Sequence, residues 1–260
     1  MNPIYNTIGT NYNVTRQADA YLTACILKFL QPVTDKHYLD IGCGTGNYTI
    51  ALANNGLNFT GVEPAEKMLD EASQKNQTIS WLKGSAEQIP VGDNIHNGVI
   101  ATLTIHHWND LYKSFTEIYR ITAVGGKLIV FTTTPSQMRG YWLNHYFPQM
   151  LESSIKQMLD LSEVEEAITG AGFKMVTTEK YFVRPDLQDH FLYSGKHRPG
   201  IYFNSDIRNG ISSFAALANT AEVKTGLGNL HKDIESGKFE EIKERYENDE
   251  GDYLFIVAEK

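Results

Sequence analysis

The chain is poor in cysteine and in basic residues. Two of its 260 residues are cysteine, Cys25 and Cys43, which is too few for a disulfide framework or a four-cysteine zinc site. The formal net charge is -8 at pH 7, from 23 Lys and Arg against 31 Asp and Glu. Because surfaces that bind nucleic acid are usually basic, we expect no nucleic-acid partner. A reducing, cytoplasmic compartment is the simplest one for these thiols.

The sequence also lacks long apolar runs and metal-binding motifs. Residues 1–17 are polar and do not resemble a signal peptide, and no later run is long enough to span a membrane. We therefore expect no membrane partner. The eight histidines show no H-E-x-x-H spacing, so a metal site is not expected either. With 42% hydrophobic and 21% charged residues, the composition is typical of a soluble globular protein.

Short apolar runs alternate with helical patterns in the first two-thirds of the chain, which is typical of a parallel sheet covered by helices. Strands are predicted at 37–41, 58–63, 79–82, 98–103, 127–132, 174–183 and 253–259. Helices are predicted from Asn47, over 65–72, over 111–122 with Gly125 and Gly126 as the stop, and from Ser162, which fits a capping box with Glu165. The alternation predicts an α/β fold.

Two stretches, 135–161 and 184–252, lack this alternation. Neither has enough apolar residues for a core of its own, so we interpret both as insertions in one domain that comprises 1–260. In open α/β sheets, ligands bind beyond the carboxyl ends of the strands. Insertions at that edge would therefore form a lid over the substrate.

The stretch YLDIGCGTGNYT, from 38 to 49, is a glycine-rich loop after a predicted strand. Gly42 and Gly44 match the first two positions of the dinucleotide fingerprint G-x-G-x-x-G, but Asn47 stands at the third and the extra glycine is Gly46. No Gly-Lys-Ser/Thr follows, so the loop is not a P-loop. Glu63, at the end of the second strand, suits the two hydroxyls of a ribose. Glu63 alone fits NAD and any other adenosine ligand.

The glycine loop and the segments after it resemble the class I S-adenosylmethionine-dependent methyltransferases. The matching segments are LDIGCGTGNYT (39–49), GVEPAEKMLDEA (61–72), KGSAEQIP (83–90), VIATLTIHHWND (99–110) and EIYRITAVGGKLIVF (117–131). Their order and spacing are far more specific than a glycine motif alone. Within the family, the chain is similar to the small-molecule branch that includes the quinone-biosynthesis C-methyltransferases, and residues 1–30 resemble the N-terminal lid helix region of that branch.

This resemblance implies a Rossmann-like, doubly wound sheet of seven strands, mostly parallel with an antiparallel last strand, and S-adenosyl-L-methionine as the cofactor. It also implies a role for each matching residue. Asp40, Gly42 and Gly44 would surround the methionine part of the cofactor, Glu63 would hold the ribose, Pro64 and Met68 would pack on the adenine, and Ser85 and Ala86 would meet the adenine edge. Thr102 and Leu103 would border the methionyl group, Arg16 would reach its carboxylate, and Tyr12 would close over the cofactor.

One departure from the family pattern concerns the adenine. Many members carry an aspartate where this chain has Ser85, and a neutral hydroxyl is a weaker acceptor for the adenine amino group than a carboxylate. We therefore expect weaker cofactor binding.

Two neighbouring histidines follow the fourth predicted strand, close to the expected reaction centre. Methyl transfer from a sulfonium needs alignment and exclusion of water, and it needs a general base only when the acceptor must lose a proton. His107 is our first candidate for a base or positioning group and His106 is the second, since imidazoles titrate near neutral pH. The alternative is that one caps the strand–helix junction and the other packs.

The acceptor is expected to be a small molecule, either acidic or aromatic. The basic residues at 196–198, with Arg184 and Arg208, could bind an acidic acceptor or could belong to a solvated loop. The aromatic residues Trp142, Tyr146 and Phe147 could line an apolar acceptor pocket or could pack inside the lid.

The leading hypothesis is therefore an S-adenosylmethionine-dependent methyltransferase that acts on a small molecule. A protein that binds the cofactor without transferring its methyl group is one alternative, since fold does not imply function. An NAD-dependent oxidoreductase is another, although Asn47 breaks the dinucleotide fingerprint.

Overall fold

The computed structural model describes residues 15–260, and a single seven-stranded sheet runs through this part of the chain. The strands lie in the order β3-β2-β1-β4-β5-β7-β6. Their bounds are β1 His37–Ile41, β2 Asn58–Glu63, β3 Ser80–Lys83, β4 His96–Thr102, β5 Thr122–Thr132, β6 Lys174–Tyr181 and β7 Tyr253–Glu259. The first five strands pair in parallel, and β7 is antiparallel to both β5 and β6. The predicted fold class is confirmed.

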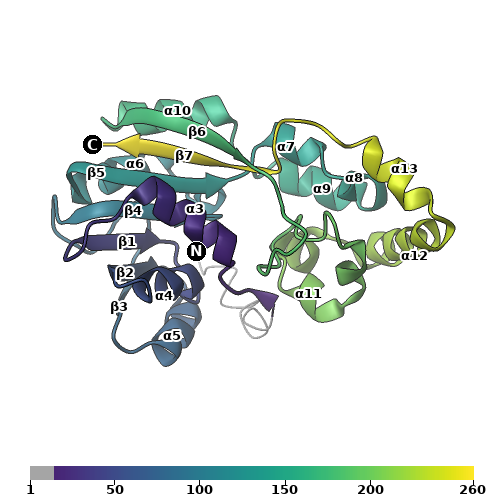
Figure 1. Cartoon of the computed structure of the whole chain (residues 1–260), viewed down its shortest axis with the longest axis horizontal. Coiled ribbons are helices and arrows are strands. Elements are labelled where there is room, and N and C mark those ends of the chain that lie inside the picture. The colour runs from purple at the N-terminus through teal and green to yellow at the C-terminus, as the bar shows by residue number, and fades with distance from the viewer. Residues whose placement is uncertain (1–14) are drawn as a thin grey trace.

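Helices cover both faces of this sheet (Figure 1). On one face, α3 (Ala20–Leu30) and α4 (Asn47–Ala53) share a core with Tyr38 and Phe59. On the other face, α6 (Leu111–Ile121) and α10 (Leu161–Gly170) share a core with Leu39 and Val99. Successive strand residues point to opposite faces, so Tyr38 and Leu39 of β1 belong to different cores. α5 (Glu66–Lys75) packs against β2 and β3.

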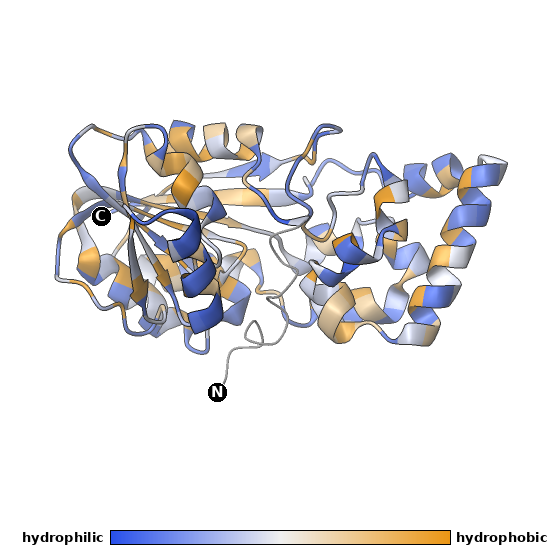
Figure 2. Cartoon of the chain, turned by 90° about the horizontal axis from the view of Figure 1, so that it is seen from below, coloured by the Kyte–Doolittle hydropathy of each residue, from blue (hydrophilic) through white to orange (hydrophobic). Residues whose placement is uncertain are grey.

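The segments 135–161 and 184–252 fold into helices that gather beyond the carboxyl ends of the parallel strands (Figure 1). These are α7 (Pro135–Arg139), α8 (Leu143–Tyr146), α9 (Pro148–Ile155), α11 (Ser205–Asn209), α12 (Thr220–Ser236) and α13 (Lys238–Glu244). Figure 2 shows apolar residues along the strands and many hydrophilic ones on the outermost helices. Because the two segments pack against each other, residues distant in sequence share one core, with Trp142 edge-on to Tyr202 and Phe239.

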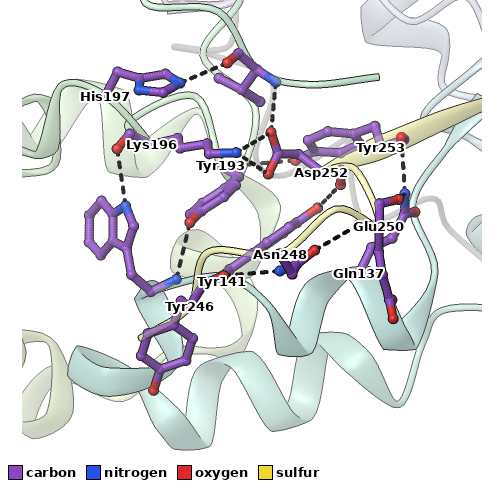
Figure 3. Close-up of polar contacts among 12 residues, drawn as sticks. Gln137, Tyr141, Tyr193, Lys196, His197, Tyr246, Asn248, Glu250, Asp252 and Tyr253 are labelled. Atoms are coloured by element: carbon purple, nitrogen blue, oxygen red, sulfur yellow. Dashed lines mark hydrogen bonds and ion pairs between the residues drawn. The ribbon is translucent and has the colours of Figure 1, made fainter. Parts of the chain in front are cut away.

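A buried polar network joins these insertions to the sheet (Figure 3). The carboxylate of Asp252, just before β7, pairs with the Lys196 ammonium at 2.8 Å and accepts the backbone N–H of Val183 at 2.7 Å. The carbonyl of Asp252 accepts the Tyr141 hydroxyl, so residues from both insertions meet at one point. Separating the two partners of such a pair would leave an uncompensated charge, which costs free energy. The pair therefore resists separation of the segments that it joins. The network therefore fixes the insertions relative to the strand ends.

The helix over 111–122 ends earlier than the sequence predicts. It stops at Ile121, and Thr122 already has extended dihedrals and pairs with His96 in the sheet. Gly125, with φ +75°, and Gly126 lie inside β5, where the register with β4 is irregular. The helix does not end at the glycines, because the chain already pairs with β4 at Thr122. The glycines instead lie at the irregularity in the pairing of β5 with β4.

The predicted capping box at Ser162 and Glu165 is also wrong. α10 begins one residue earlier, at Leu161, and its N-cap Asp160 makes no side-chain cap bond. The carboxylate of Glu165 accepts the Thr178 hydroxyl of β6 at 3.1 Å instead. Tertiary pairing with the sheet outweighed the local capping signal.

Within the described part of the chain, no helix is both long enough and apolar enough to cross a membrane.

Candidate functional site

A cavity of about 780 Å³ opens at the carboxyl ends of the parallel strands, between the sheet and the insertions. This size falls within the range of about 300–1,000 Å³ typical of small-molecule sites. Every predicted site residue in the described part of the chain lines it: Arg16, Asp40, Gly42, Gly44, Glu63, Pro64, Met68, Ser85, Ala86, Thr102, Leu103, His106 and His107. Tyr12 lies outside the described residues. Segments more than eighty residues apart in sequence thus converge on one space.

The glycine loop between β1 and α4 needs glycine for two physical reasons. Gly42 has φ +71° and Gly44 has φ +55°, a conformation that side chains with a Cβ rarely adopt. A Cβ on Gly42 would also lie 2.1 Å from the Thr104 hydroxyl oxygen. The N–H of Gly42 donates to the Val62 carbonyl at 2.8 Å and so ties the loop to the end of β2. The loop is therefore held at the strand ends, and its residues line the cavity.

The extra glycine of the loop, Gly46, allows close packing of the loop against the Trp81 ring. A Cβ there would lie 2.4 Å from the Trp81 ring of β3, so the start of α4 approaches the sheet only because the residue is glycine. Asn47, at the third fingerprint position, links neighbouring segments. Its amide donates to the Arg16 carbonyl at 3.0 Å and accepts the Lys75 ammonium at 2.7 Å. Asn47 thus holds the segment before α3 beside the loop.

Two buried carboxyl groups face the loop. Glu63 accepts the N–H of Gly44 at 3.1 Å and the N–H of Ala65 at 2.9 Å. Burial raises the pKa of Glu63, and these two donors oppose that shift. Asp40 accepts the Thr49 hydroxyl at 2.6 Å, and burial raises the pKa of its carboxyl to about 7. Since desolvated carboxylates favour a nearby cation, this end of the cavity suits a positively charged ligand.

The end of β4 borders the cavity with an unusual backbone. Leu103 has φ +52°, which is rare for a residue with a branched side chain, while its N–H donates to the Phe131 carbonyl at 2.8 Å. Non-glycine residues in this conformation cluster at ligand sites, where surrounding structure holds them. The turn directs the chain from Thr102 into Thr104, whose hydroxyl lies against Gly42.

A third acidic group near the predicted adenine edge was missed in the sequence. Glu87 lines the cavity two residues after Ser85 and accepts the N–H of Asn109 at 2.7 Å. Hydrogen bonds from Ser85 and from this backbone hold the pKa of Glu87 below its usual range, against the opposing effect of burial. Its place two residues after Ser85, within the matched segment 83–90, is the signal that could have found it.

His106 and His107 both line the cavity, on the 3₁₀ turn Ile105–His107. Their ring centroids are 3.9 Å apart. Burial lowers the pKa of His106 to about 3, with a further contribution from His107, and burial also lowers the pKa of His107. The Nδ1 atom of His106 is buried and has no hydrogen-bond partner among the described residues. The cavity wall therefore includes a neutral imidazole whose buried Nδ1 has no hydrogen-bond partner among the described residues.

An ion pair that the sequence does not reveal lies at the cavity wall. The guanidinium of Arg16 pairs with the carboxylate of Asp189 through Nε at 2.5 Å and Nη2 at 3.1 Å. Tyr48 donates its hydroxyl to the same carboxylate at 3.1 Å. Asp189 is almost fully buried and lies 173 residues from Arg16 along the chain, so no local pattern could have found this pair.

Part of the wall comes from the insertions. The residues involved are Met138, Met158, Asp189, Phe191, Leu192, Ile211, Ser212 and Ser213. Trp142, Tyr146 and Phe147 are absent from it, since all three are buried in the core of the insertions. Of the two readings left open for these aromatic residues, the structure supports packing inside the lid.

The basic residues considered for an acidic acceptor do not line the cavity either. Lys196 pairs with Asp252, and the Arg208 guanidinium donates to the Tyr202 carbonyl at 2.5 Å. Arg184 forms an exposed ion pair with Asp186. These contacts hold the three cations within the insertions, and none of the basic residues considered belongs to the lining of this cavity.

Comparisons with known proteins agree with the geometry. Residues 39–130 match the family model described as Methyltransferase domain. Among solved structures, a candidate methyltransferase of an antibiotic biosynthesis pathway from Anabaena variabilis ATCC 29413 is similar. It is 33% identical, has a TM-score of 0.84, and aligns over 94% of this chain and 98% of its own.

Curated relatives match over shorter stretches. An uncharacterised methyltransferase of Mycobacterium tuberculosis is 33% identical over 116 residues, which are 44% of this chain and 47% of that protein. The malonyl-(acyl-carrier protein) O-methyltransferase of Serratia marcescens is 27% identical over 150 residues, 57% of this chain and 58% of that protein. The chain thus spans about half the length of the curated relatives it matches. Since the family match includes the glycine loop and the likeness to the Anabaena protein covers nearly the whole chain, the chain belongs to the S-adenosylmethionine-dependent methyltransferase family.

Proposed function

We propose that this protein transfers a methyl group from S-adenosylmethionine to a small-molecule acceptor. The observation that carries the proposal is the cavity itself. One side of it is the glycine loop with two buried carboxyl groups, Asp40 and Glu63, and the other side is formed by the insertions. A cofactor and an acceptor can meet in one such space, shielded from water, which is the main requirement of an in-line displacement.

The acidic lining of the cavity complements the positive charge of the cofactor. Four carboxyl groups line the cavity in the described part of the chain, and Arg16 is the single Lys or Arg among the same residues. The carboxyl groups are those of Asp40, Glu63, Glu87 and Asp189. When bound, the cofactor supplies an activated methyl group on a cationic sulfonium, and an acidic lining favours that charge.

Each predicted binding residue has a proposed role at this wall. Glu63 would accept the ribose hydroxyls on the carboxylate lone pairs that Gly44 and Ala65 leave open, since each carboxylate oxygen accepts more than one bond. Asp40 would face the cofactor ammonium. Arg16 would offer its guanidinium to the cofactor carboxylate while Asp189 holds it in place.

The remaining predicted residues would shape the rest of the cofactor site. Pro64 and Met68 would pack on the adenine, Ser85 and Ala86 would meet its edge, and Gly42, Thr102 and Leu103 would border the methionyl group. Tyr12 would close over the cofactor from the segment outside the described residues.

The protein's part in the reaction would be alignment and, where the acceptor carries a proton, its removal. His106 offers a neutral imidazole with an unpartnered Nδ1, and His107 lies next to it. A neutral imidazole can accept a proton or a hydrogen bond from the acceptor. His107 stays the first candidate for a base on resemblance, whereas the unpartnered atom belongs to His106.

The segments 135–161 and 184–252 would be the substrate lid of a single methyltransferase domain over 1–260. Within the proposed N-terminal lid region 1–30, α3 packs on the sheet beside β5, and Arg16 lines the cavity. A cytoplasmic location is a prediction from the sequence.

Isothermal titration with S-adenosylmethionine and with its demethylated product S-adenosylhomocysteine tests the cofactor part of the proposal. We expect both to bind. A folded protein that binds neither at millimolar concentration would contradict it. Titration with NADH tests the oxidoreductase alternative, for which we expect no binding. Transfer of a labelled methyl group to components of a host extract then separates an enzyme from a protein that binds the cofactor without transferring its methyl group.

A further inference from the structure

The part of the cavity wall that comes from the insertions is mostly apolar. We call Met138, Met158, Phe191, Leu192 and Ile211 the acceptor wall, since these lining residues belong to the insertions. Met138, Phe191 and Ile211 are buried, and Met158 and Leu192 are partly exposed. Methionine side chains adapt to irregular ligands, and such a wall binds by excluding water from apolar groups. An acceptor with an apolar body therefore fits it.

The charges around the acceptor wall disfavour an anion. Arg16 is the single Lys or Arg among the described lining residues, and it is paired with the buried Asp189. The basic residues of the insertions are used elsewhere, as the Lys196–Asp252 pair shows in Figure 3. Burial also lowers the pKa values of both cavity histidines, so these supply no positive charge at neutral pH. A buried anion needs partners of opposite charge, and this wall offers none.

A buried polar atom without a partner supplies the hydrogen bond that an uncharged acceptor would need. The Nδ1 atom of His106 is such an atom, and the residue lines the same cavity. Leaving it unpaired costs free energy, whereas a hydroxyl, amide or neutral amine group on the acceptor would satisfy it. The polar end of the acceptor would then lie at the end of β4, where the reaction centre is expected.

We propose that the methyl acceptor is an uncharged molecule with a largely apolar body, bound against the acceptor wall with its polar group at His106. Carboxylate and phosphorylated compounds are excluded from this site. The inference rests on the proposed function, because it names the substrate class of the same cavity.

Two matched fluorescent probes test the charge preference on the protein saturated with S-adenosylhomocysteine. N-phenyl-1-naphthylamine is uncharged, and 8-anilino-1-naphthalenesulfonate carries the same two aromatic groups with a sulfonate. We expect the uncharged probe to bind at least about tenfold more tightly, since one unpaired buried charge costs more than one factor of ten. Equal or tighter binding of the sulfonate would overturn the proposal. Calorimetry with S-adenosylhomocysteine alone decides the proposed function separately, because it uses no probe.

A charge placed on the acceptor wall shows whether the probes bind there. In Leu192→Lys we expect the sulfonate to bind about tenfold more tightly, through one charge-assisted contact, and the uncharged probe to bind more weakly. Leu192→Gln separates the loss of apolar contact from the added charge and should weaken the uncharged probe without helping the sulfonate. Val124→Lys adds the same charge at an exposed position on β5 outside the cavity lining and should change neither affinity.

Met158→Lys is the second variant on the partly exposed part of the wall, used if Leu192→Lys does not fold. If a folded variant leaves the ratio of the two affinities unchanged, the wall is not the acceptor site and the proposal fails.

In the methyl-transfer assay, host metabolites are separated on an anion exchanger before the reaction. We expect acceptor activity in the fraction that does not bind the exchanger, and activity confined to the bound fraction would overturn the proposal.

Discussion

The two ends of the cavity are made from different kinds of sequence. The glycine-loop end comes from consecutive strand ends, and its residues follow one another in a fixed pattern from Asp40 to Leu103. The insertion end comes from scattered residues such as Met138, which lies in α7, and Met158 and Ile211, which follow α9 and α11. The first end is polar and acidic, and the second is mostly apolar. The difference indicates that cofactor binding and acceptor choice depend on separate parts of the chain.

The largest expected effect comes from the core of the insertions. Trp142 is fully buried, and Trp142→Ala should lower the free energy of unfolding by about 3–5 kcal/mol, as for other large aromatic residues in a core. Because Trp142 does not line the cavity, we expect the affinity for S-adenosylhomocysteine in the folded variant to stay nearly unchanged. Denaturant unfolding and calorimetry measure the two quantities.

A tryptophan at the other end provides the matched variant. Trp81 packs on Gly46 of the glycine loop, so Trp81→Ala should weaken cofactor binding as well as stability. If Trp142→Ala weakens the cofactor as much as Trp81→Ala does, the two ends are not separate and the comparison fails.

The next effect concerns the proposed ribose ligand. Glu63→Ala should weaken S-adenosylmethionine binding by about 2–3 kcal/mol, the value of a charge-assisted hydrogen-bond pair, which is roughly 30- to 150-fold in affinity. Calorimetry measures it. Glu66→Ala is the control, because Glu66 is a mostly exposed carboxylate three residues away that pairs with Lys83. An affinity of Glu63→Ala equal to that of the wild type would remove Glu63 from the ribose site.

Two glycines sharpen the contrast between the ends. Gly42→Ala should destabilise the protein by about 1–3 kcal/mol through its positive φ alone, and the contact with Thr104 should distort the loop and weaken the cofactor further. Gly228→Ala, inside α12, meets nothing within 4 Å and should stabilise the helix by about 0.5–1 kcal/mol with no effect on the cofactor. Thermal unfolding with and without S-adenosylhomocysteine compares the stability and the cofactor binding of the two variants. Equal changes in both variants would show that neither the positive φ of Gly42 nor its contact with Thr104 affects cofactor binding.

The last effect is a pH dependence at the glycine-loop end. The carboxyl of Asp40 has its pKa raised from 3.8 to about 7 by burial, so it becomes charged in the free protein only as pH approaches 7. A charged carboxylate attracts a cationic ligand, so the affinity for S-adenosylmethionine should rise between about pH 5 and pH 7, by at most about tenfold per unit for one proton. Asp40→Asn should flatten this rise, whereas His107→Gln should retain it.

The same raised pKa acts on stability with the opposite sign. Between the ordinary value of 3.8 and about 7, the folded protein holds a proton on Asp40 that the unfolded chain has lost. The free energy of unfolding without ligand should therefore fall as pH rises through this window, and Asp40→Asn should remove that fall. A variant with an unchanged slope would show that another group titrates.

Much of the sheet and the glycine-loop end could be predicted because their signals are local. The bounds of β1, β2 and β7 agree with the prediction residue for residue. The prediction was wrong where a distant partner decided the outcome, as at Thr122, which joins the sheet opposite His96 before the glycines are reached. The aromatic residues of 135–161 were ambiguous because burial and pocket lining favour the same residue types.

The sequence by itself determined the fold class, the family and the residues around the glycine loop, because strand, glycine and carboxylate patterns follow from short-range geometry. Only the tertiary structure decided which side chains form the acceptor wall and which cations are already paired. Arg16 and Asp189 meet across 173 residues, and the Nδ1 atom of His106 is left without a partner only in the assembled cavity. Contacts of this kind depend on how separate segments pack against each other, so no local sequence pattern predicts them.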